Sequence, residues 1–161
     1  MIACQKNLGV ESTLLNAVQQ TNILQIEKII KLVENTLGNI KNKQITILGL
    51  SFKEESDDIR ESTSIKLIKI LLKKQAKVNA HDPKAIENTR AIFGDKIRYN
   101  EGIKDALNNT DCVIVMTPWK QYSKLHNADF EGMKKKIIVD TRRIVNVNDK
   151  KIKYIGLGIG S

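Results

Sequence analysis

Cysteine and proline are scarce in this sequence of 161 residues, and aromatic residues make up only 4% of it. Its 2 cysteines, Cys4 and Cys112, lie far apart and fit no metal-ligand spacing. The sequence therefore predicts neither the disulfide framework of a secreted protein nor a metal site. We expect a cytoplasmic protein whose apolar core is large enough to stabilise it without such cross-links.

Long apolar runs are also missing from the sequence. No run approaches the roughly 20 residues that a membrane-spanning helix needs, and the first residues lack the apolar stretch of a signal peptide. We therefore expect no association with a membrane.

Positive charge is in excess, with a formal net charge of +9 at pH 7. Such a surface attracts phosphates, nucleic acids and anionic membranes at long range. The lysines are scattered along helical faces and loops, however, and few aromatic residues lie between them to stack on bases. A solvated, lysine-rich surface is the preferred interpretation, and nucleic acid is not expected as a partner. The alternative, a nucleic-acid binder, would show strongly salt-dependent affinity without nucleotide preference.

Apolar residues recur at helical spacing from Glu11 to about Leu37, which predicts one long helix. Ser12 or Thr13 can cap its start, and Gly38 is the residue type at which helices commonly end. Left alone, this helix would expose an apolar stripe, so we expect a homodimer built across residues 11–37. The stripe consists of Leu14, Leu15, Val18, Ile23, Ile26, Ile29, Ile30 and Val33.

After a polar connector at residues 39–43, short β-branched runs alternate with amphipathic segments. This alternation predicts βαβ units with right-handed crossovers, hence a doubly wound, Rossmann-like parallel α/β sheet over residues 44–161. Runs that are apolar throughout are typical of strands covered by helices on both faces. The predicted strands are Ile45–Leu48, Val78–His81, Val113–Met116, Ile137–Val139 and one near Ile152–Ile155, and the predicted helices are Ser64–Lys74, Lys84–Phe93 and Gly102–Asn108.

In an open parallel sheet, ligands bind beyond the carboxyl ends of the strands. The loop after the first predicted strand, Gly49–Ser62, is long and charged and lacks the G-x-G-x-x-G pattern of an ordinary NAD-binding crossover. Side chains must therefore meet the ligand: Phe52 can stack on a base or sugar, and Lys53 can meet a phosphate or carboxylate. Arg142, after a neighbouring strand, adds a fork of donors. Alternatively, Phe52 belongs to the core, and Lys53 and Arg142 pair with acids.

Three acidic residues also follow strands. Asp82 stands where a dinucleotide fold often places a ribose-binding acid, but Pro83 follows it, so an aspartate that opens a turn is the preferred interpretation. Asp57 and Asp58 suggest a metal or acid–base site, but adjacent carboxylates usually point apart. We expect one of them to pair with Arg60 or to cap the helix that follows.

The remaining candidates have ordinary structural explanations. His81 and His126 are isolated from any nucleophile or metal partner, so we expect satisfied core or surface histidines. Trp119 packs either under the ligand mouth or elsewhere within the domain. The glycines of residues 156–160 resemble a phosphate loop, but no helix follows them before Ser161, which favours a terminal strand or chain end.

The loop after the first strand resembles the signature of the nucleotide-sugar dehydrogenase family, of the UDP-glucose/GDP-mannose type. The matching runs are Gly49-Leu50-Ser51-Phe52-Lys53 and Asp57-Asp58-Ile59-Arg60-Glu61-Ser62. The resemblance continues, in order, through Asp82-Pro83-Lys84, Thr117-Pro118-Trp119, Asp140-Thr141-Arg142 and Tyr154-Ile155-Gly156-Leu157-Gly158. Upstream, residues 8–10 and 17–25 resemble the start of that family's long central dimerisation helix.

The resemblance implies a three-part enzyme with an amino-terminal NAD domain. Residues 1–43 would belong to its central helical region, and residues 44–161 would be its carboxy-terminal domain, which binds the nucleotide of the sugar. Such enzymes oxidise the sugar's C6 alcohol to a carboxylate with two NAD. A cysteine captures the aldehyde as a thiohemiacetal, which becomes a thioester and is hydrolysed.

The resemblance also implies roles for individual residues. By position, Phe52, Lys53 and Arg142 correspond to residues that contact the substrate, and Arg60 corresponds to an arginine that reaches NAD. UDP-glucose or a related UDP-sugar is the expected ligand, with GDP-mannose second.

The sequence departs from the family in one respect that concerns catalysis. The family's nucleophilic cysteine lies in a Gly-Gly-x-Cys-x-Pro-Lys-Asp type segment, which is missing here together with the NAD domain. Cys4 is not that residue, and a small buried or chain-end thiol is its preferred interpretation. We therefore assign no catalytic residue and expect that the chain alone does not turn over. The alternative is a non-enzymatic module that uses the same fold for regulation or scaffolding.

Overall fold

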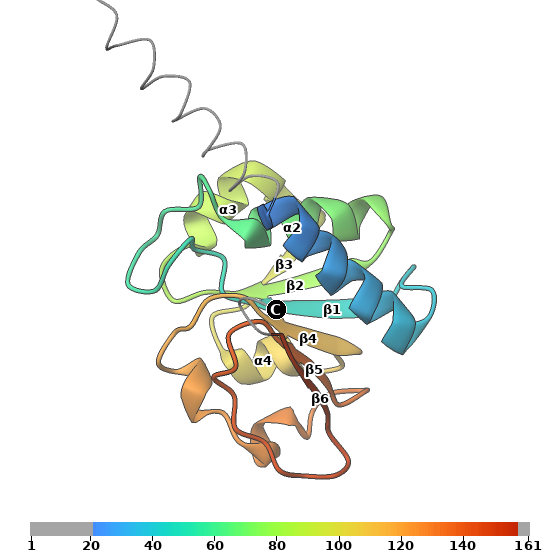
Figure 1. The fold of residues 1–161 in the computed structure, drawn as a ribbon. Coiled ribbons are helices and arrows are strands. Elements are labelled where there is room, and N and C mark those ends of the chain that lie inside the picture. Colours follow the sequence, from blue (N-terminus) through green and yellow to red (C-terminus); the bar gives the residue numbers. More distant parts are fainter. Residues whose placement is uncertain (1–20, 158–161) are drawn as a thin grey trace, which may run out of the picture.

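The computed structural model describes residues 21–157, which fold around a six-stranded sheet (Figure 1). The strand order is β3-β2-β1-β4-β5-β6, and every neighbouring pair is parallel. This confirms the predicted doubly wound α/β fold and places its switch point between β1 and β4. The strands are β1 Gln44–Leu48, β2 Lys77–His81, β3 Arg98–Tyr99, β4 Cys112–Val115, β5 Ile137–Asp140 and β6 Lys153–Gly156.

Some sequence-based expectations concern parts of the chain outside the described residues. These are the interpretation of Cys4, the beginning of the long helix with its caps, and the chain end from residue 158.

Three helices connect the strands: α2 Thr63–Lys73, α3 Ile86–Phe93 and α4 Ile103–Leu107. Ser62 caps α2, because its side chain accepts a hydrogen bond from the Ser64 N–H at 3.2 Å. Helix α3 begins two residues later than Lys84, where the sequence predicts it. In the turn before it, the backbone N–H groups of Lys84 and Ala85 bond to the Asp82 carboxylate.

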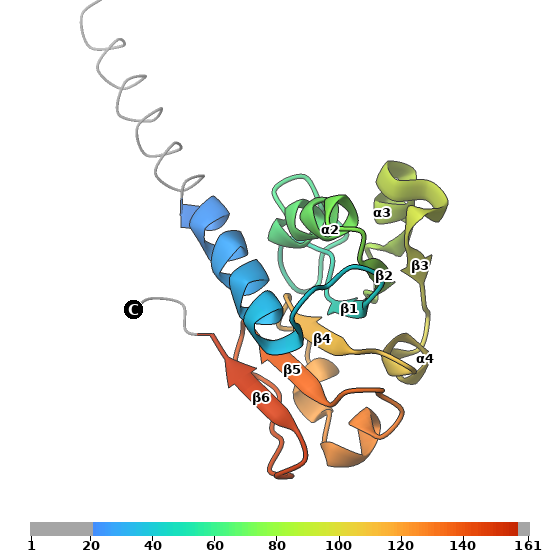
Figure 2. The ribbon, with the colours of Figure 1, turned by 90° about the vertical axis from the view of Figure 1, so that its right-hand side faces the viewer.

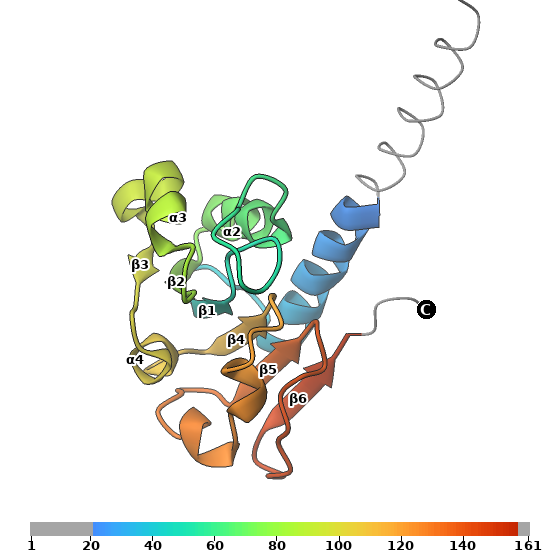
Figure 3. The same ribbon diagram turned by 90° about the vertical axis from the view of Figure 1, so that its left-hand side faces the viewer.

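Each face of the sheet has its own apolar core, because successive strand residues point to opposite faces. In β4, Cys112 and Ile114 pack on one side, and Val113 and Val115 pack on the other. The first side is covered by α2, α3 and the helix of residues 21–37, and the second is covered by α4 (Figures 2 and 3). Both faces of the central strands are thus buried, which explains why β4 is apolar throughout.

The helix before the sheet ends where the sequence predicts. Its last helical residue is Leu37, Gly38 has a φ of 75°, and the Gly38 N–H donates to the Glu34 carbonyl at 2.8 Å. The expectation that its apolar stripe lies exposed is wrong for the described residues that pack into the first core. The sheet of the same chain covers them: Ile26, Ile29, Ile30 and Val33. Ile23 and Leu24 are exposed by 51% and 58%.

The sequence pattern missed the shortest elements. Strand β3 has two residues, too few for a periodic signal. Three short 3₁₀ helices were missed for the same reason: Gly94–Lys96, Tyr122–Lys124 and Asn127–Phe130. None of the helices within residues 21–157 is long and apolar enough to cross a membrane.

Candidate functional site

The carboxyl ends of four adjacent strands meet at one edge of the sheet. Their last residues are in register, since Leu48 of β1 lies opposite both His81 of β2 and Val115 of β4, and Val115 lies opposite Asp140 of β5. The loops that follow these strands therefore start side by side. The four residues to which the sequence analysis gave binding roles lie in these loops: Phe52, Lys53, Arg60 and Arg142.

The loop after β1 and the loop after β4 are in direct contact at Gly49. Gly49 has a φ of 97°, and a Cβ atom there would lie 2.5 Å from the Thr117 Cβ and 2.6 Å from the Thr117 nitrogen. The Thr117 hydroxyl donates to the Ser51 carbonyl at 2.9 Å. The glycine that opens the loop is therefore required by the close approach of two backbones.

Asp82, just after β2, fixes the start of the same loop. It is buried, and its Oδ2 accepts the N–H groups of Leu50 at 2.7 Å and Ser51 at 3.1 Å. The indole N–H of Trp119 donates to the same oxygen at 3.1 Å, while Oδ1 accepts the N–H groups of Lys84 and Ala85, just before α3. This confirms the preferred interpretation of Asp82 as a turn residue, and its carboxylate is fully used within the protein. The Trp119 ring packs in the apolar core on the side of the sheet that holds Val113 and Val115, and its bond to Asp82 links that core to the loops.

The middle of the β1 loop projects from this framework. Phe52 is 54% exposed, so the alternative that it belongs to the core is wrong. Its backbone N–H donates to the Asp58 carbonyl at 2.8 Å, which closes the projecting part of the loop. Lys53 is exposed and forms no ion pair with any described residue. Both side chains are therefore accessible to a ligand.

Arg142 follows β5 but reaches across to the end of β4. Its Nε donates to the Met116 carbonyl at 2.7 Å, and its backbone N–H donates to Asp140 at 2.9 Å. The side chain is partly buried, and burial lowers the pKa of the guanidinium. Within the described residues Arg142 pairs with no acid, so its charge is available to an anionic ligand.

Arg60 is held differently. It forms the expected ion pair with Asp58, with Nη2 2.7 Å from Oδ2 and Nε 3.0 Å from Oδ1. The Arg60 hydrogen bonds hold the pKa of the Asp58 carboxyl down at about 2. The neighbouring Asp57 accepts hydrogen bonds from Asn88 of α3, which tie this half of the loop to that helix. The Arg60 side chain is 86% exposed.

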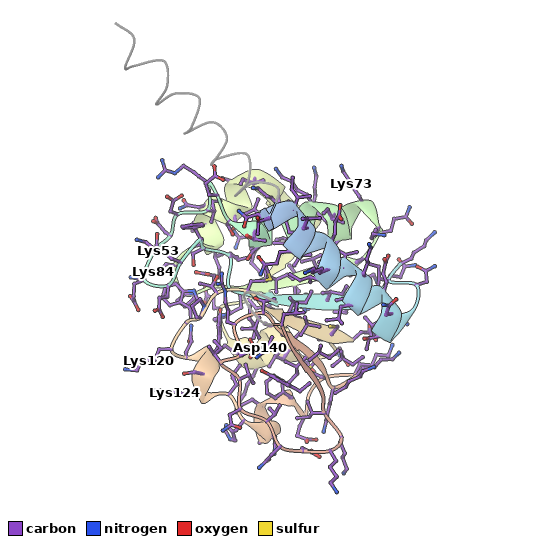
Figure 4. The ribbon with its side chains drawn as sticks, in the orientation of Figure 1. Lys53, Lys73, Lys84, Lys120, Lys124 and Asp140 are labelled. Atoms are coloured by element: carbon purple, nitrogen blue, oxygen red, sulfur yellow. The ribbon has the colours of Figure 1, made fainter. Side chains whose placement is uncertain are left out.

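Four lysines lie along the same side of the molecule as these loops (Figure 4). Lys53 follows β1, Lys84 follows β2, and Lys120 and Lys124 follow β4. Lys84 pairs with Glu55 at 3.0 Å, whereas Lys120 and Lys124 have no acidic partner within residues 21–157. The edge thus combines an exposed aromatic ring with unpaired cations, the chemistry that a nucleoside diphosphate requires.

The titratable groups beneath the edge serve the structure. His81 is buried and its Nδ1 lies 2.8 Å from the Tyr122 hydroxyl, and burial lowers its pKa. His126 lies 2.7 Å from Asp129 at the surface. Both histidines are satisfied, as expected. Cys112 is buried within β4, where burial raises the pKa of its thiol to about 12, so it is not a nucleophile.

Asp140 lies in the Asp140-Thr141-Arg142 run, but the sequence pattern indicated no role for it. It is fully buried and accepts five hydrogen bonds from the chain that follows it. In the sequence, Asp140 can be recognised only as an aspartate at the end of an apolar strand that contains no lysine or arginine to pair with it. Which amides converge on it depends on the fold of the following loop.

Comparisons with known proteins agree with this geometry. Residues 46–147 match the model of the UDP-glucose/GDP-mannose dehydrogenase family, UDP binding domain. UDP-glucose 6-dehydrogenase AglM of Haloferax volcanii is 39% identical over 145 residues, which is 90% of this chain and 33% of that protein. UDP-glucose 6-dehydrogenase TuaD of Bacillus subtilis is 28% identical over 99% of this chain and 35% of its own length.

Solved structures show the same likeness. A UDP-glucose dehydrogenase from Pyrobaculum islandicum matches 89% of this chain and 31% of its own, with 33% identity and a TM-score of 0.74. UDP-N-acetyl-mannosamine dehydrogenase Cap5O from Staphylococcus aureus has 20% identity and a TM-score of 0.67 over 88% of this chain and 31% of its own, a likeness of fold alone. The chain spans about a third of the length of the curated relatives that it matches. The family model covers more than half of the chain, and the chain therefore belongs to the UDP-glucose/GDP-mannose dehydrogenase family.

Proposed function

We propose that this chain binds the nucleoside diphosphate of a nucleotide sugar at the carboxyl edge of its sheet. The observation that carries the proposal is the convergence of two loops over the end of β4: Thr117 bonds to the β1 loop, and Met116 bonds to Arg142. Lys53 and Arg142 would neutralise the phosphates, and Phe52 would cover the base or the sugar. UDP-glucose or a related UDP-sugar is the proposed ligand, with GDP-mannose as the second candidate.

The proposed reaction of the complete enzyme is the oxidation of the sugar's C6 alcohol to a carboxylate with NAD. The sheet edge itself does not suit a dinucleotide, because the β1 loop lacks the glycine pattern and Asp82 is occupied by its own loop contacts. NAD would therefore be held by another domain, and the exposed Arg60 would reach it after release from Asp58. When bound, NAD supplies the hydride acceptor.

A reactive thiol is needed for the proposed chemistry, and the described part of the chain offers none. Cys112 is buried and its thiol has a raised pKa, and Cys4 lies outside the described residues. We therefore propose that this chain contributes nucleotide binding to the activity and does not turn over alone.

A homodimer through the helix of residues 11–37 is also proposed. Within the described part, only its first turns leave apolar side chains uncovered, at Ile23 and Leu24. A contact between two copies would therefore begin there rather than along the buried stripe. Analytical ultracentrifugation that shows a monomer at high concentration would exclude the dimer.

Calorimetric titration of UDP, GDP and NAD into the purified chain tests nucleotide binding. We expect UDP to bind, and we expect Lys53→Ala and Arg142→Ala each to weaken it about tenfold or more, because each removes a charge-assisted bond to phosphate. Lys73→Ala is the matched control, since Lys73 is exposed on α2 and lies away from the labelled lysines of the edge (Figure 4). Equal losses in all three variants, or no binding of any nucleotide, would contradict the proposal. The absence of nucleotide binding would favour the alternative hypothesis, a non-enzymatic module.

A further inference from the structure

Asp140 is a buried carboxylate without a cationic partner among the described residues. Its Oδ1 accepts the N–H groups of Arg142 at 2.9 Å and Arg143 at 2.8 Å. Its Oδ2 accepts those of Ile144 at 2.9 Å and Val145 at 2.8 Å, and the hydroxyl of Tyr154 at 3.1 Å. Four consecutive backbone amides thus converge on one side chain. Such amide–carboxylate bonds are charge-assisted and stronger than neutral ones.

The convergence forces an unusual backbone conformation. Arg143 has a φ of 55°, in the left-handed region that residues other than glycine rarely adopt. This turn lets the amides on both sides of it face the same carboxylate. The bonds to Asp140 therefore stabilise a loop conformation that the sequence of the loop does not favour by itself.

The loop conformation in turn directs the Arg142 side chain. The backbone N–H of Arg142 is fixed to Asp140 of β5, while its Nε is fixed to the Met116 carbonyl beyond β4. In the described residues no hydrogen bond involves its two terminal nitrogens, which leaves them to a ligand. We infer that Asp140 is a positioning residue for Arg142 and sets the affinity for the nucleoside diphosphate through it, an inference that rests on the proposed function.

Asp140→Asn is the informative substitution. The side-chain amide keeps the shape of the carboxylate, but its NH₂ group faces two of the four backbone N–H groups, which lose their acceptor. We expect the Kd for UDP to rise about tenfold. Tyr154→Phe is the matched control, because it removes one hydrogen bond from the same carboxylate and leaves the four amide bonds in place. Its Kd should stay within about twofold of the unaltered value.

A double-mutant cycle separates positioning from a general loss of structure. If Asp140 acts through Arg142, then Asp140→Asn weakens UDP binding about tenfold in the unaltered background and less than about twofold beside Arg142→Ala. An equal loss in both backgrounds would overturn the inference.

A second measurement does not depend on any nucleotide. Exchange of the Arg142 Nε–H, followed by NMR, should be slow in the unaltered chain and at least about tenfold faster in Asp140→Asn, while the β4 amides stay protected. Unchanged exchange of Nε–H in that variant would refute the positioning role. If Asp140→Asn does not fold, exchange in the unaltered chain tests the inference. Fast exchange of the Arg142 Nε–H beside four protected loop amides would show that the loop does not hold the side chain. If no nucleotide binds, the proposed function and the effect on affinity both fail, and the exchange rates alone decide whether Asp140 positions Arg142.

Discussion

Gly49 shows how a single atom can decide whether the loops of the edge fit together. Its positive φ and its distance to Thr117 leave no room for a Cβ. We predict that Gly49→Ala lowers the free energy of unfolding by about 3 kcal/mol or more, because backbone strain and a clash with fixed backbone atoms add up. Urea unfolding followed by circular dichroism measures the change.

Gly38 supplies the control for this prediction. Its φ is 75°, but a Cβ there would meet no atom within 4 Å. Gly38→Ala should therefore cost only the strain of a left-handed residue, about 1 kcal/mol. Similar costs at both glycines would show that the contact between Gly49 and Thr117 is looser than the structure indicates.

Asp58 provides a prediction about pH. Its folded-state pKa of about 2 lies below the ordinary value of 3.8. The stabilisation from the ion pair with Arg60 is therefore fully present above pH 3.8 and is lost as the pH falls through about 2. We expect the carboxyl signal of Asp58 to titrate near pH 2 by NMR and to move towards 3.8 in Arg60→Gln. A carboxyl that titrates at its ordinary pKa in the unaltered chain would show that Arg60 is not held by Asp58.

At the same scale, the sequence indicates which side chains stand at the edge but not how they are held. Phe52, Lys53 and Arg142 could be named because they follow predicted strands, and the edge of a parallel sheet is the usual ligand site. The contact between the Arg142 Nε and the Met116 carbonyl could not be predicted, because the two residues meet only after β4 and β5 have paired. The roles of Phe52, Lys53 and Arg142 in binding stay predictions.

At the scale of elements, the long periodic segments were predictable and the short ones were not. The strands other than β3 and the three helices between strands follow from apolar runs and helical spacing. Strand β3 exists because Arg98 and Tyr99 pair with β2, a tertiary contact without local signal. Likewise, the apolar stripe of the first helix was evident, but periodicity does not tell whether the same chain or a second copy covers it.

Two isoleucines of that helix test what covers its stripe. Ile29 is fully buried against the first core, whereas Ile23 is half exposed. We predict that Ile29→Ala lowers the free energy of unfolding by about 2–5 kcal/mol, as for other large-to-small changes in a core. Ile23→Ala should change it by less than about 0.5 kcal/mol in a monomer. Thermal unfolding at several protein concentrations distinguishes the cases, since a concentration-dependent loss at Ile23 would locate a contact between copies there.

At the scale of the whole molecule, the net charge of +9 is distributed so that part of it surrounds the proposed site. Lys53, Lys84, Lys120 and Lys124 lie on one side of the molecule, whereas Lys73 lies on α2 (Figure 4). A field of this kind raises the rate at which an anionic ligand associates and leaves its dissociation rate largely unchanged. The charge therefore has a kinetic role in the proposed function.

Lys120 and Lys124 carry the test of this role, because neither is paired with an acid in the described part of the chain and neither is among the residues proposed to bind the nucleotide. We predict that Lys120→Gln combined with Lys124→Gln slows association of UDP about threefold at low salt and leaves its dissociation rate unchanged. At about 1 M salt, where the Debye length is roughly 3 Å, the difference should vanish. The control is Lys69→Gln combined with Lys73→Gln on α2, which changes the net charge equally. Stopped-flow rates that fall equally in both pairs would mean that total charge, not its position at the sheet edge, governs the encounter.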